Sequence, residues 1–481
     1  MRRQPQSNEH TRLEHDALGP VPVPLNRLWG AVTERSRSHF AIGEPAAYRW
    51  PRSVIRAFGL VKQAAAAANA AVGTIDPAVA DLIRQAAEEV IAGRLDDEFP
   101  LGVFQTGSGT HSNMNANEVI ANRANQLAGQ EPGTYRPVHP NDHVNHGQST
   151  NDVFPAVMHL ATLEGLDHLE EALAPLRRAL GERAGRWREI PILGRTHLQD
   201  ATPVMLGDVV ASWASQLDHG RSRLREARPY LYRLALGATA VGSGLNAHRE
   251  FGRRAIEHLA AATGYPLQQA VDLVAGLSAH DAMETASAAM RSLAGALFKM
   301  ANDIRLYGSG PRGGFGELTL PANEPGSSMM PGKVNPSQCE ALTMVAVHVF
   351  GCDATVAWAN AQGPLQLNVY KPVILHNVLE PARLLRDAAA AFTQYCVSGL
   401  EPDLARIDEH LQASLMLVTA LVPHIGYVRA AELALTAHRE GRGLREVAVE
   451  TGVVTADQFD AWVRPVEMAR PHGPAPGEEQ A

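Results

Sequence analysis

Four polar segments of the chain collect the residue types that bind a small carboxylate and move protons beside it. They occupy residues 105–118, 139–152, 194–200 and 325–340, and each is rich in Gly, Ser, Thr or Asn. In the first segment, glycines allow hydroxyls and backbone N–H groups to converge on a small anion. That segment matches neither a P-loop, which needs G-x-x-x-x-G-K-[ST], nor the pattern G-x-G-x-x-G. The four segments therefore favour a carboxylate ligand over a nucleotide.

Proton removal next to a carboxylate is the chemistry that this inventory suits. It yields a doubly charged aci-carboxylate, which survives only where preorganised donors and a cation stabilise the developing charge. Lys333 can supply the cation, and Ser, Thr and Asn side chains can supply the donors. A serine base in residues 325–336 would need desolvation and nearby positive dipoles, because its hydroxyl is otherwise far too weakly acidic.

Each segment also has a plainer interpretation when it is taken alone. Residues 105–118 could be a polar loop that caps a helix, and His197 could be a structural histidine. Residues 325–336 could be a mobile connector, with glycines and prolines on both sides of Ser327 and Ser328. Within it, Asn335-Pro336 predicts the N-cap and first turn of a helix.

The histidines of the second segment raise the alternative of a metal site. His139, His143 and His146 could bind a metal, with Asp142 as a fourth ligand. However, Pro140 interrupts any helix that would align them, and no Cys or carboxylate motif supports the site. The sequence favours a site without metal.

Long helices must position these segments. Apolar residues recur at steps of three and four over residues 166–180, 206–224, 283–304 and 342–359, a pattern typical of long helices that pack at shallow angles. A shorter helix is predicted after Asp76, and no convincing strand series is present. The predicted class is mainly α, with a long central helix bundle. Met344, Val345 and Val347 make one helix apolar on several sides, which favours an oligomer.

The length of 481 residues predicts more than one domain. We expect a mixed helix and loop domain over residues 1–148, the long-helix bundle over 149–402, and a small helical domain over 403–481. The end of the last domain, PHGPAPGEEQA, is predicted to be disordered.

The composition excludes some classes of binding partner and some cellular settings. The net charge of −8 argues against nucleic acid or an anionic membrane as the main partner. Three cysteines are too few for a disulfide framework and favour a reduced, cytoplasmic setting. The apolar window 341–361 contains His348 and Asp353, so we expect a buried helix and no membrane span.

The chain contains only four lysines. Lys333 and Lys371 lie in polar segments, whereas the sequence offers no account of Lys62 and Lys299. A flexible ammonium at position 333 suits a loop that must meet a carboxylate as it closes.

Several motifs carry a family resemblance. The run GSSMMPGKVNP at 326–336 resembles the signature loop of the fumarase/aspartase superfamily. The runs TGSGT at 106–110, HPND at 139–142, GRTHLQD at 194–200 and SQCE at 337–340 resemble class II fumarases in particular. The likeness extends from about residue 12 to 468, including LWGA at 28–31 and WVRP at 462–465.

This resemblance implies a metal-free, cofactor-free enzyme of the tricarboxylic acid cycle that reversibly and stereospecifically hydrates fumarate to L-malate. It further implies a homotetramer with a core of twenty helices, five from each chain, flanked by smaller N- and C-terminal helical domains. Each active site would draw segments from three chains. The implied substrate is a small dicarboxylate, with neither nucleic acid nor membrane as a partner.

The resemblance also implies roles for individual residues. Ser327 would remove the C3 proton, and His197, paired with Glu340, would handle the water or the leaving hydroxyl. The residues implied to hold the substrate, or to lie beside it, are Ser108, Gly109, Thr110, Ser149, Thr150, Asn151, Thr196, Ser328, Lys333 and Asn335. A second, non-catalytic carboxylate site is implied at Arg136, His139, Pro140, Asn141 and Asp142.

The chain departs from the family pattern at a few positions. His111 stands where fumarases usually have Gln, and His143 and His146 replace commoner residues near the second site. Thr150 gives a form also found among aspartases, and Gln366 occupies a position that usually carries Glu. Two alternatives therefore accompany fumarate hydration: an ammonia lyase acting on L-aspartate or a relative of it, and a catalytically silent scaffold. Intact Ser327, His197, Glu340, Lys333 and Asn335 argue against the scaffold.

Overall fold

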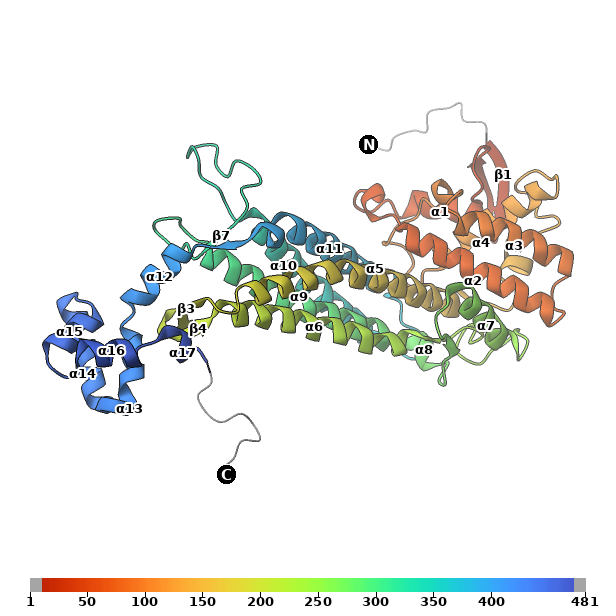
Figure 1. Cartoon of the computed structure of the whole chain (residues 1–481). Helices are drawn as coiled ribbons and strands as arrows, with labels where there is room; N and C mark the ends of the chain where they lie inside the picture. Colours follow the sequence, from red (N-terminus) through yellow and green to blue (C-terminus); the bar gives the residue numbers. More distant parts are fainter. Residues whose placement is uncertain (1–10, 471–481) are drawn as a thin grey trace, which may run out of the picture. The chain divides into compact units, whose positions relative to one another are not determined.

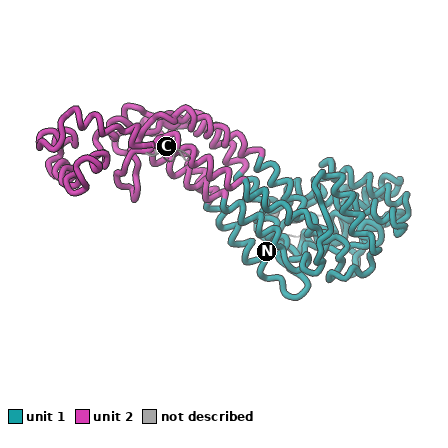
Figure 2. The backbone as a smooth tube through the Cα atoms, turned by 60° about the horizontal axis from the view of Figure 1, so that its bottom comes forward, with its two compact units in different colours: residues 1–170, 222–292, 347–385 teal, residues 171–221, 293–346, 386–481 magenta. Residues whose placement is uncertain are grey.

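The computed structural model describes residues 11–470 of the chain. The predicted disordered tail lies outside the described residues. Within them the chain is mainly α, as predicted, and it divides into two compact units (Figure 2). Within the described residues, the first unit is formed by residues 11–170, 222–292 and 347–385, and the second by residues 171–221, 293–346 and 386–470.

Five long helices correspond to the predicted bundle and are labelled in Figure 1. They are α5 (Thr150–Arg186), α6 (Leu206–Leu231), α9 (Asp281–Tyr307), α10 (Ser337–Asn360) and α11 (Lys371–Tyr395). The apolar seams read from the sequence are their buried faces: Leu166, Leu173 and Leu180 of α5 are fully buried, as are Met283 and Ile304 of α9. The predicted division into three domains stays a prediction.

The first unit combines parts of the long helices with shorter elements. Its helices are α1 (Ala31–His39), α2 (Arg52–Ala71), α3 (Pro77–Ile91), α4 (Thr110–Leu127), α7 (Phe251–Thr263) and α8 (Ala275–Ser278). Asp76 caps α3 by accepting a hydrogen bond from the N–H of Ala78, as its sequence predicts. Within this unit, α6 contacts α5 through the ion pair between Arg228 and Asp167.

The second unit contains the other parts of the long helices and the C-terminal helices. Arg177 of α5 pairs with Asp218 of α6, and the Trp213 indole donates to Asp303 of α9. The C-terminal helices are α12 (Leu404–Ala413), α13 (Val422–Ile425), α14 (Tyr427–Glu440), α15 (Leu444–Glu450), α16 (Ala456–Trp462) and α17 (Pro465–Met468). Together with Leu193 they enclose an apolar core that includes Leu421.

Short strands, which the sequence did not reveal, accompany these helices. Among the described residues the strands form four two-stranded sheets. They are β1 (Thr11–Asp16) with β2 (Gly19–Pro24), β3 (Pro191–Thr196) with β4 (Gln199–Met205), β5 (Arg233–Leu234) with β6 (Gln268–Gln269), and β7 (Leu318–Thr319) with β8 (Glu401–Pro402). Strands this short carry too few alternations to stand out in a sequence. The β3–β4 hairpin matters most, because it holds Thr196 and His197.

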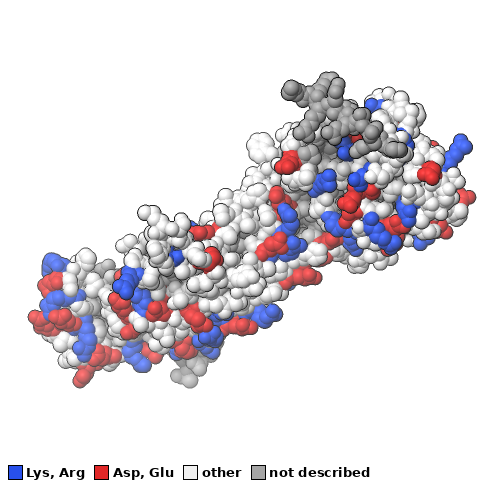
Figure 3. Space-filling model, turned by 90° about the horizontal axis from the view of Figure 1, so that it is seen from above, with Lys and Arg blue, Asp and Glu red and all other residues white. Residues whose placement is uncertain are grey.

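Helix α10 is, within the described residues, the one helix long and apolar enough to cross a membrane by length and composition. The core helix of a soluble protein passes the same test. The prediction that this helix is buried is only partly confirmed, since 33% of its most apolar stretch is buried. Met344, Val347 and Trp358 are exposed in the single chain, as expected for a helix that needs more neighbours than one chain supplies. Acidic and basic side chains are interspersed on the face shown in Figure 3.

Candidate active site

A tight loop brings the predicted hydroxyl groups to the start of α4. Gly109 precedes the helix with a φ of +83°, a conformation that favours glycine, and a Cβ there would lie 2.3 Å from the Phe154 ring. The hydroxyls of Ser108 and Thr110 lie 2.8 Å apart. Gly109 provides no side-chain cap, so the positive end of the α4 dipole is available to an anion.

The second polar segment brings Ser149 and Thr150 to the start of α5. The amide of Asn113, on α4, donates to the Thr150 hydroxyl at 2.9 Å and to the side-chain oxygen of Asn145 at 3.1 Å. Lys62 of α2 donates to Asn145 Oδ1 at 3.0 Å and to Gln148 Oε1 at 2.9 Å. These hydrogen bonds connect the N-terminal ends of α4 and α5 to each other and to the buried ammonium group of Lys62.

Asp152 connects a further segment to the start of α5. One of its carboxylate oxygens accepts the N–H of Ser149 at 3.0 Å, and the other accepts the N–H groups of Gly237 and Thr239, each at 3.0 Å. The Asn151 amide donates to the carbonyl of Ala240 at 2.8 Å. Residues 237–246 thus form a fifth polar segment, which our sequence reading missed.

A pocket of about 420 Å³ opens between these elements of the first unit. Its polar lining comprises Thr110, Asn113, Asn145, Gln148, Ser149, Thr150, Thr239 and Asn246. The Oδ1 atom of Asn113 and the hydroxyl of Thr239 are buried and have no hydrogen-bond partner among the described residues. Buried polar atoms without partners are costly, so the pocket offers unused hydrogen-bonding capacity to a ligand.

Two buried charges support this pocket. Burial lowers the pKa of Lys62 from 10.5 to about 7, while the nearby Asp152 carboxylate opposes that shift. Burial likewise raises the pKa of Asp152 to about 6, although its backbone N–H donors and Lys62 favour the ionised form. The pocket therefore combines two helix N-termini, several hydroxyls and a buried lysine, which suits a small anion.

In the second unit, His197 lies at the tip of the β3–β4 hairpin. His197 and Leu198 form its two-residue turn with φ values of +57° and +60°. Two non-glycine residues in this conformation are strained, a condition that clusters at functional sites. Arg195 anchors the hairpin through a bidentate ion pair with Glu317, at 2.9 and 2.6 Å. Thr196 and His197 are both exposed in the single chain.

The loop at 325–336 holds Ser327 in a specific electrostatic setting. Its hydroxyl oxygen accepts the N–H of Met330 at 2.9 Å and that of Met329 at 3.2 Å. These two amide dipoles direct their positive ends at the Ser327 oxygen. A hydroxyl that receives two N–H donors is stabilised in its anionic form.

The same loop is closed by its own side chains. Lys333 Nζ donates to Asn335 Oδ1 at 2.6 Å, and the Asn335 amide donates to the carbonyl of Gly326 at 2.6 Å. Asn335 was predicted as a helix N-cap, and this is wrong: its side chain closes the loop, and α10 begins at Ser337. Met329 is 87% exposed, so one chain leaves this loop uncovered.

The predicted site residues form two groups in the single chain. The first unit holds Ser108, Gly109, Thr110, Ser149, Thr150 and Asn151. The second unit holds Thr196, His197, Ser327, Ser328, Lys333, Asn335 and Glu340. Pairing of His197 with Glu340 stays a prediction, and both side chains are exposed in the single chain.

The residues predicted for a second carboxylate site surround a short turn in the first unit. His139 Nδ1 accepts the N–H groups of Asn141, at 3.2 Å, and Asp142, at 3.1 Å. Pro140 is buried, whereas Arg136, Asn141 and Asp142 are exposed.

The neighbouring histidines are engaged with the backbone. His143 Nδ1 accepts the N–H of His139 at 2.8 Å, and His146 Nδ1 lies 3.1 Å from the Asp142 carbonyl. Burial lowers the pKa of His143. His139, Asp142, His143 and His146 do not converge as a metal-ligand group in the described part of the chain.

Of two other departures from the family pattern, His111 has defined surroundings. His111 Nδ1 lies 3.0 Å from the Ser36 hydroxyl, and its ring contacts Phe40 with centroids 5.1 Å apart. Burial lowers the pKa of His111, which favours the neutral imidazole. Gln366 is exposed, and nothing in the structure explains its replacement of Glu.

Comparisons with known proteins agree with the fold. A family model described as Lyase matches residues 19–351, and one described as Fumarase C C-terminus matches residues 417–470. The class II fumarate hydratase of Thermosynechococcus vestitus is 55% identical over 455 residues, which cover 94% of this chain and 97% of the relative. That of Pseudomonas syringae pv. tomato is 52% identical over 459 residues, covering 95% and 98%.

A solved structure also matches this chain over most of its length. The crystal structure of recombinant class II fumarase from Schistosoma mansoni matches with a TM-score of 0.93 at 39% sequence identity, covering 96% of this chain and 100% of that chain. The helical fold and the family match define a lyase. More specifically, the chain belongs to the class II fumarate hydratase family. The resemblance inferred from the sequence is confirmed.

Proposed function

We propose that this chain catalyses the reversible hydration of fumarate to L-malate. The observation that carries the proposal is the Ser327 hydroxyl, whose oxygen accepts N–H groups from Met329 and Met330. A base that acts next to a carboxylate needs this kind of stabilisation, because an unassisted serine hydroxyl does not ionise near neutral pH.

In the direction from malate, ionised Ser327 takes the proton from C3. The electron pair left at C3 delocalises into the adjacent carboxylate and gives the aci-carboxylate intermediate. The C2–O bond then breaks, and the hydroxyl leaves as water after it receives a proton from His197. Lys333 and neighbouring amide and hydroxyl donors stabilise the doubly charged carboxylate. The proposed steps use side chains and backbone dipoles, without a metal or a cofactor.

His197 carries the second proton transfer. Its place at a hairpin tip, braced by Arg195 and Glu317, holds the imidazole at a fixed position while leaving it exposed to the substrate. Glu340 pairs with this imidazole and stabilises its protonated form.

Hydroxyl and amide groups hold the substrate. The dicarboxylate is bound by Ser108, Thr110, Asn151, Thr196, Lys333 and Asn335, with Gly109, Ser149, Thr150 and Ser328 beside it. The pocket at the beginnings of α4 and α5 supports this assignment, since both helix dipoles favour a carboxylate there. A separate carboxylate site at Arg136 and residues 139–142 is part of the same proposal.

Assembly into a homotetramer would join the two groups of site residues, with each active site drawn from three chains. Exposed apolar side chains on α10 and in the 325–336 loop support this, as Trp358 is 71% and Met329 87% exposed. Exposed apolar patches of this kind are typical of surfaces that bind another protein chain. Twenty long helices, five from each chain, would form the core. The setting proposed is the cytoplasm.

An ultraviolet assay of the fumarate double bond tests the function. Purified protein is given L-malate or L-aspartate, and we expect absorbance to rise with malate only. Turnover of aspartate but not of malate would instead indicate an ammonia lyase. Turnover of neither substrate would favour a scaffold on this fold.

A further inference from the structure

Four potential metal ligands face one another on α10 and α11, and none of them is assigned to hydration. His348 and Cys352 lie one turn apart on α10, and His376 and Glu380 lie one turn apart on α11. All four belong to the first unit. Residues four apart on a helix share one face, so each helix presents a pair of ligands to the other.

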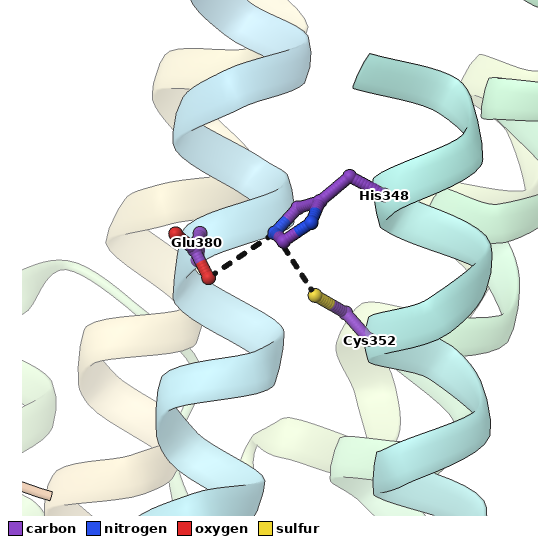
Figure 4. A group of neighbouring side chains, drawn as sticks. All are labelled: His348, Cys352 and Glu380. Carbon is purple, nitrogen blue, oxygen red and sulfur yellow. Dashed lines mark hydrogen bonds and ion pairs between the residues drawn. The ribbon is translucent and has the colours of Figure 1, made fainter. Parts of the chain in front are cut away.

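The donor atoms of three of these residues converge. The ligand atoms of His348, Cys352 and Glu380 all lie within 4.8 Å of one another. His348 Nε2 lies 3.5 Å from the Cys352 sulfur and 3.3 Å from a carboxylate oxygen of Glu380 (Figure 4). The imidazole thus points into the space between the other two side chains.

These separations fit a bound ion. A tetrahedral zinc ion with the usual bond lengths separates nitrogen from sulfur ligands by about 3.5 Å and nitrogen from oxygen ligands by about 3.3 Å. Both values match the distances at His348. The Cys352 and Glu380 ligand atoms lie within 4.8 Å of each other, so the two side chains need to approach somewhat to hold one ion together with His348.

Donor type and exposure also suit a transition metal. A thiolate, an imidazole and a carboxylate together favour zinc or cobalt over magnesium or calcium, which prefer oxygen alone. In the single chain Cys352 is buried and the His348 side chain is 51% exposed, so an ion can reach the group before the chains assemble. His376 Nε2 lies 3.3 Å from the same Glu380 oxygen and can hold that carboxylate in place.

We propose that His348, Cys352 and Glu380 bind a divalent transition-metal ion such as Zn²⁺, with water as the fourth ligand. His376 is a positioning residue that orients the Glu380 carboxylate. Binding displaces the thiol proton of Cys352 into solvent, and no oxidant or reductant takes part. The ion ties α10 to α11 and takes no part in the hydration of fumarate.

Cobalt spectroscopy tests this site directly. The full-length protein is treated with EDTA, dialysed under reducing conditions and titrated with Co²⁺. We expect one ion per chain, with a thiolate-to-cobalt charge-transfer band and the strong visible bands of tetrahedral cobalt. Cys352→Ser should abolish the charge-transfer band, and His348→Ala and Glu380→Gln should each weaken binding by at least about tenfold. His376→Ala should weaken binding while keeping the charge-transfer band.

Matched controls separate the site from other cysteines and histidines. Cys396→Ala and His168→Ala, at a buried cysteine and an exposed histidine elsewhere, should leave the titration unchanged. Zn²⁺ should raise the Tm of the unaltered protein but not that of Cys352→Ser. Absence of the band in the unaltered protein, or its survival in Cys352→Ser, overturns the proposal. His348→Ala provides the decisive comparison if Cys352→Ser fails to fold, since His348 is exposed in the single chain and lies outside its core.

Discussion

Lys62 donates a hydrogen bond of 2.9 Å to the side-chain oxygen of Gln148, directly before the first turn of α5. The same ammonium bonds Asn145 at 3.0 Å, and its side chain is fully buried. A lysine that the sequence left unexplained therefore holds the loop that brings Ser149 and Thr150 to the pocket. Burial of a charge without a carboxylate in direct contact is costly, which suggests that its position serves the site.

Lys62→Met is expected to impair substrate binding while the chain still folds. Methionine fills much of the same volume, but Asn145 and Gln148 lose their donor and the pocket loses a nearby positive charge. We expect kcat/KM for L-malate to fall at least about tenfold, consistent with the loss of a charged hydrogen bond. Lys299→Met is the matched control, because Lys299 is an exposed lysine paired with Asp303 on α9. Equal activities of the two variants would contradict this role.

Ser327→Ala should retain assembly and lose nearly all turnover. Removal of the hydroxyl removes the proposed base, so a loss of about a thousandfold or more in kcat is expected. Light scattering should give the same mass for the variant and the unaltered protein. Ser212→Ala, which removes an exposed hydroxyl from α6, should keep full activity. Near-normal turnover by the Ser327 variant would refute the assigned base.

The sequence predicted the helices well because their signal is local. Heptad-like spacing marks the buried faces of α5 and α9 directly, and Asp76 marks the start of α3. The β3–β4 hairpin escaped prediction because Thr196 and His197 lie at a turn whose positive φ values are carried by His and Leu, without the glycine that usually signals such a turn.

The candidate pocket depends on contacts that no local pattern encodes. Asn113 looks like one of several asparagines in α4, yet its amide joins Thr150 to Asn145. Thr239 lies far along the chain and reaches the pocket through the Asp152 carboxylate. Glycines at 237, 242 and 244 among Thr, Ser and Asn residues did provide a compositional signal for that segment.

Gly109→Ala should destabilise the fold more than a glycine-to-alanine change at a position where the added Cβ meets no other atom. The new methyl group would meet Phe154 at 2.3 Å, and the φ of +83° is unfavourable for alanine. Gly129→Ala is the matched control, since Gly129 has a φ of +77° and no atom within 4 Å of its added Cβ.

Urea unfolding should therefore show a cost of about 1 kcal/mol for Gly129→Ala and a larger cost for Gly109→Ala. The additional change Phe154→Leu should recover part of the difference, because it relieves the contact without altering φ. Equal costs for the two glycine variants would show that the Phe154 contact is unimportant.

Turnover of malate should be insensitive to EDTA. The proposed hydration steps involve no ion, so prolonged chelation followed by dialysis should leave kcat unchanged. The proposed metal site on α10 and α11 predicts a different response in the same sample, namely a lower Tm. Strong loss of turnover on chelation would restore the alternative of a metal at His139, His143 and His146.

Acid should destabilise the folded chain through His159, which is buried in α5. Its Nδ1 lies 3.1 Å from the Leu231 carbonyl, and burial lowers the pKa of His159 from 6.5 to about 4. The unfolded chain therefore takes up a proton near pH 6.5, whereas the folded chain resists it until about pH 4. The stability that this neutral histidine maintains is complete above pH 6.5 and is lost as the pH falls toward 4.

The free energy of unfolding should fall by roughly 3 kcal/mol between pH 6.5 and 4 because of His159. In His159→Asn this contribution to the pH dependence of the unfolding free energy should be absent. Asparagine keeps a donor near the Leu231 carbonyl but does not titrate. His168→Asn, at an exposed position on the same helix, should leave the pH dependence as it was. Buried His280, whose pKa is also lowered by burial, retains its own contribution in both variants. If the free energy of unfolding in urea depends on pH with the same slope for His159→Asn and for the unaltered protein, another group causes the loss of stability in acid.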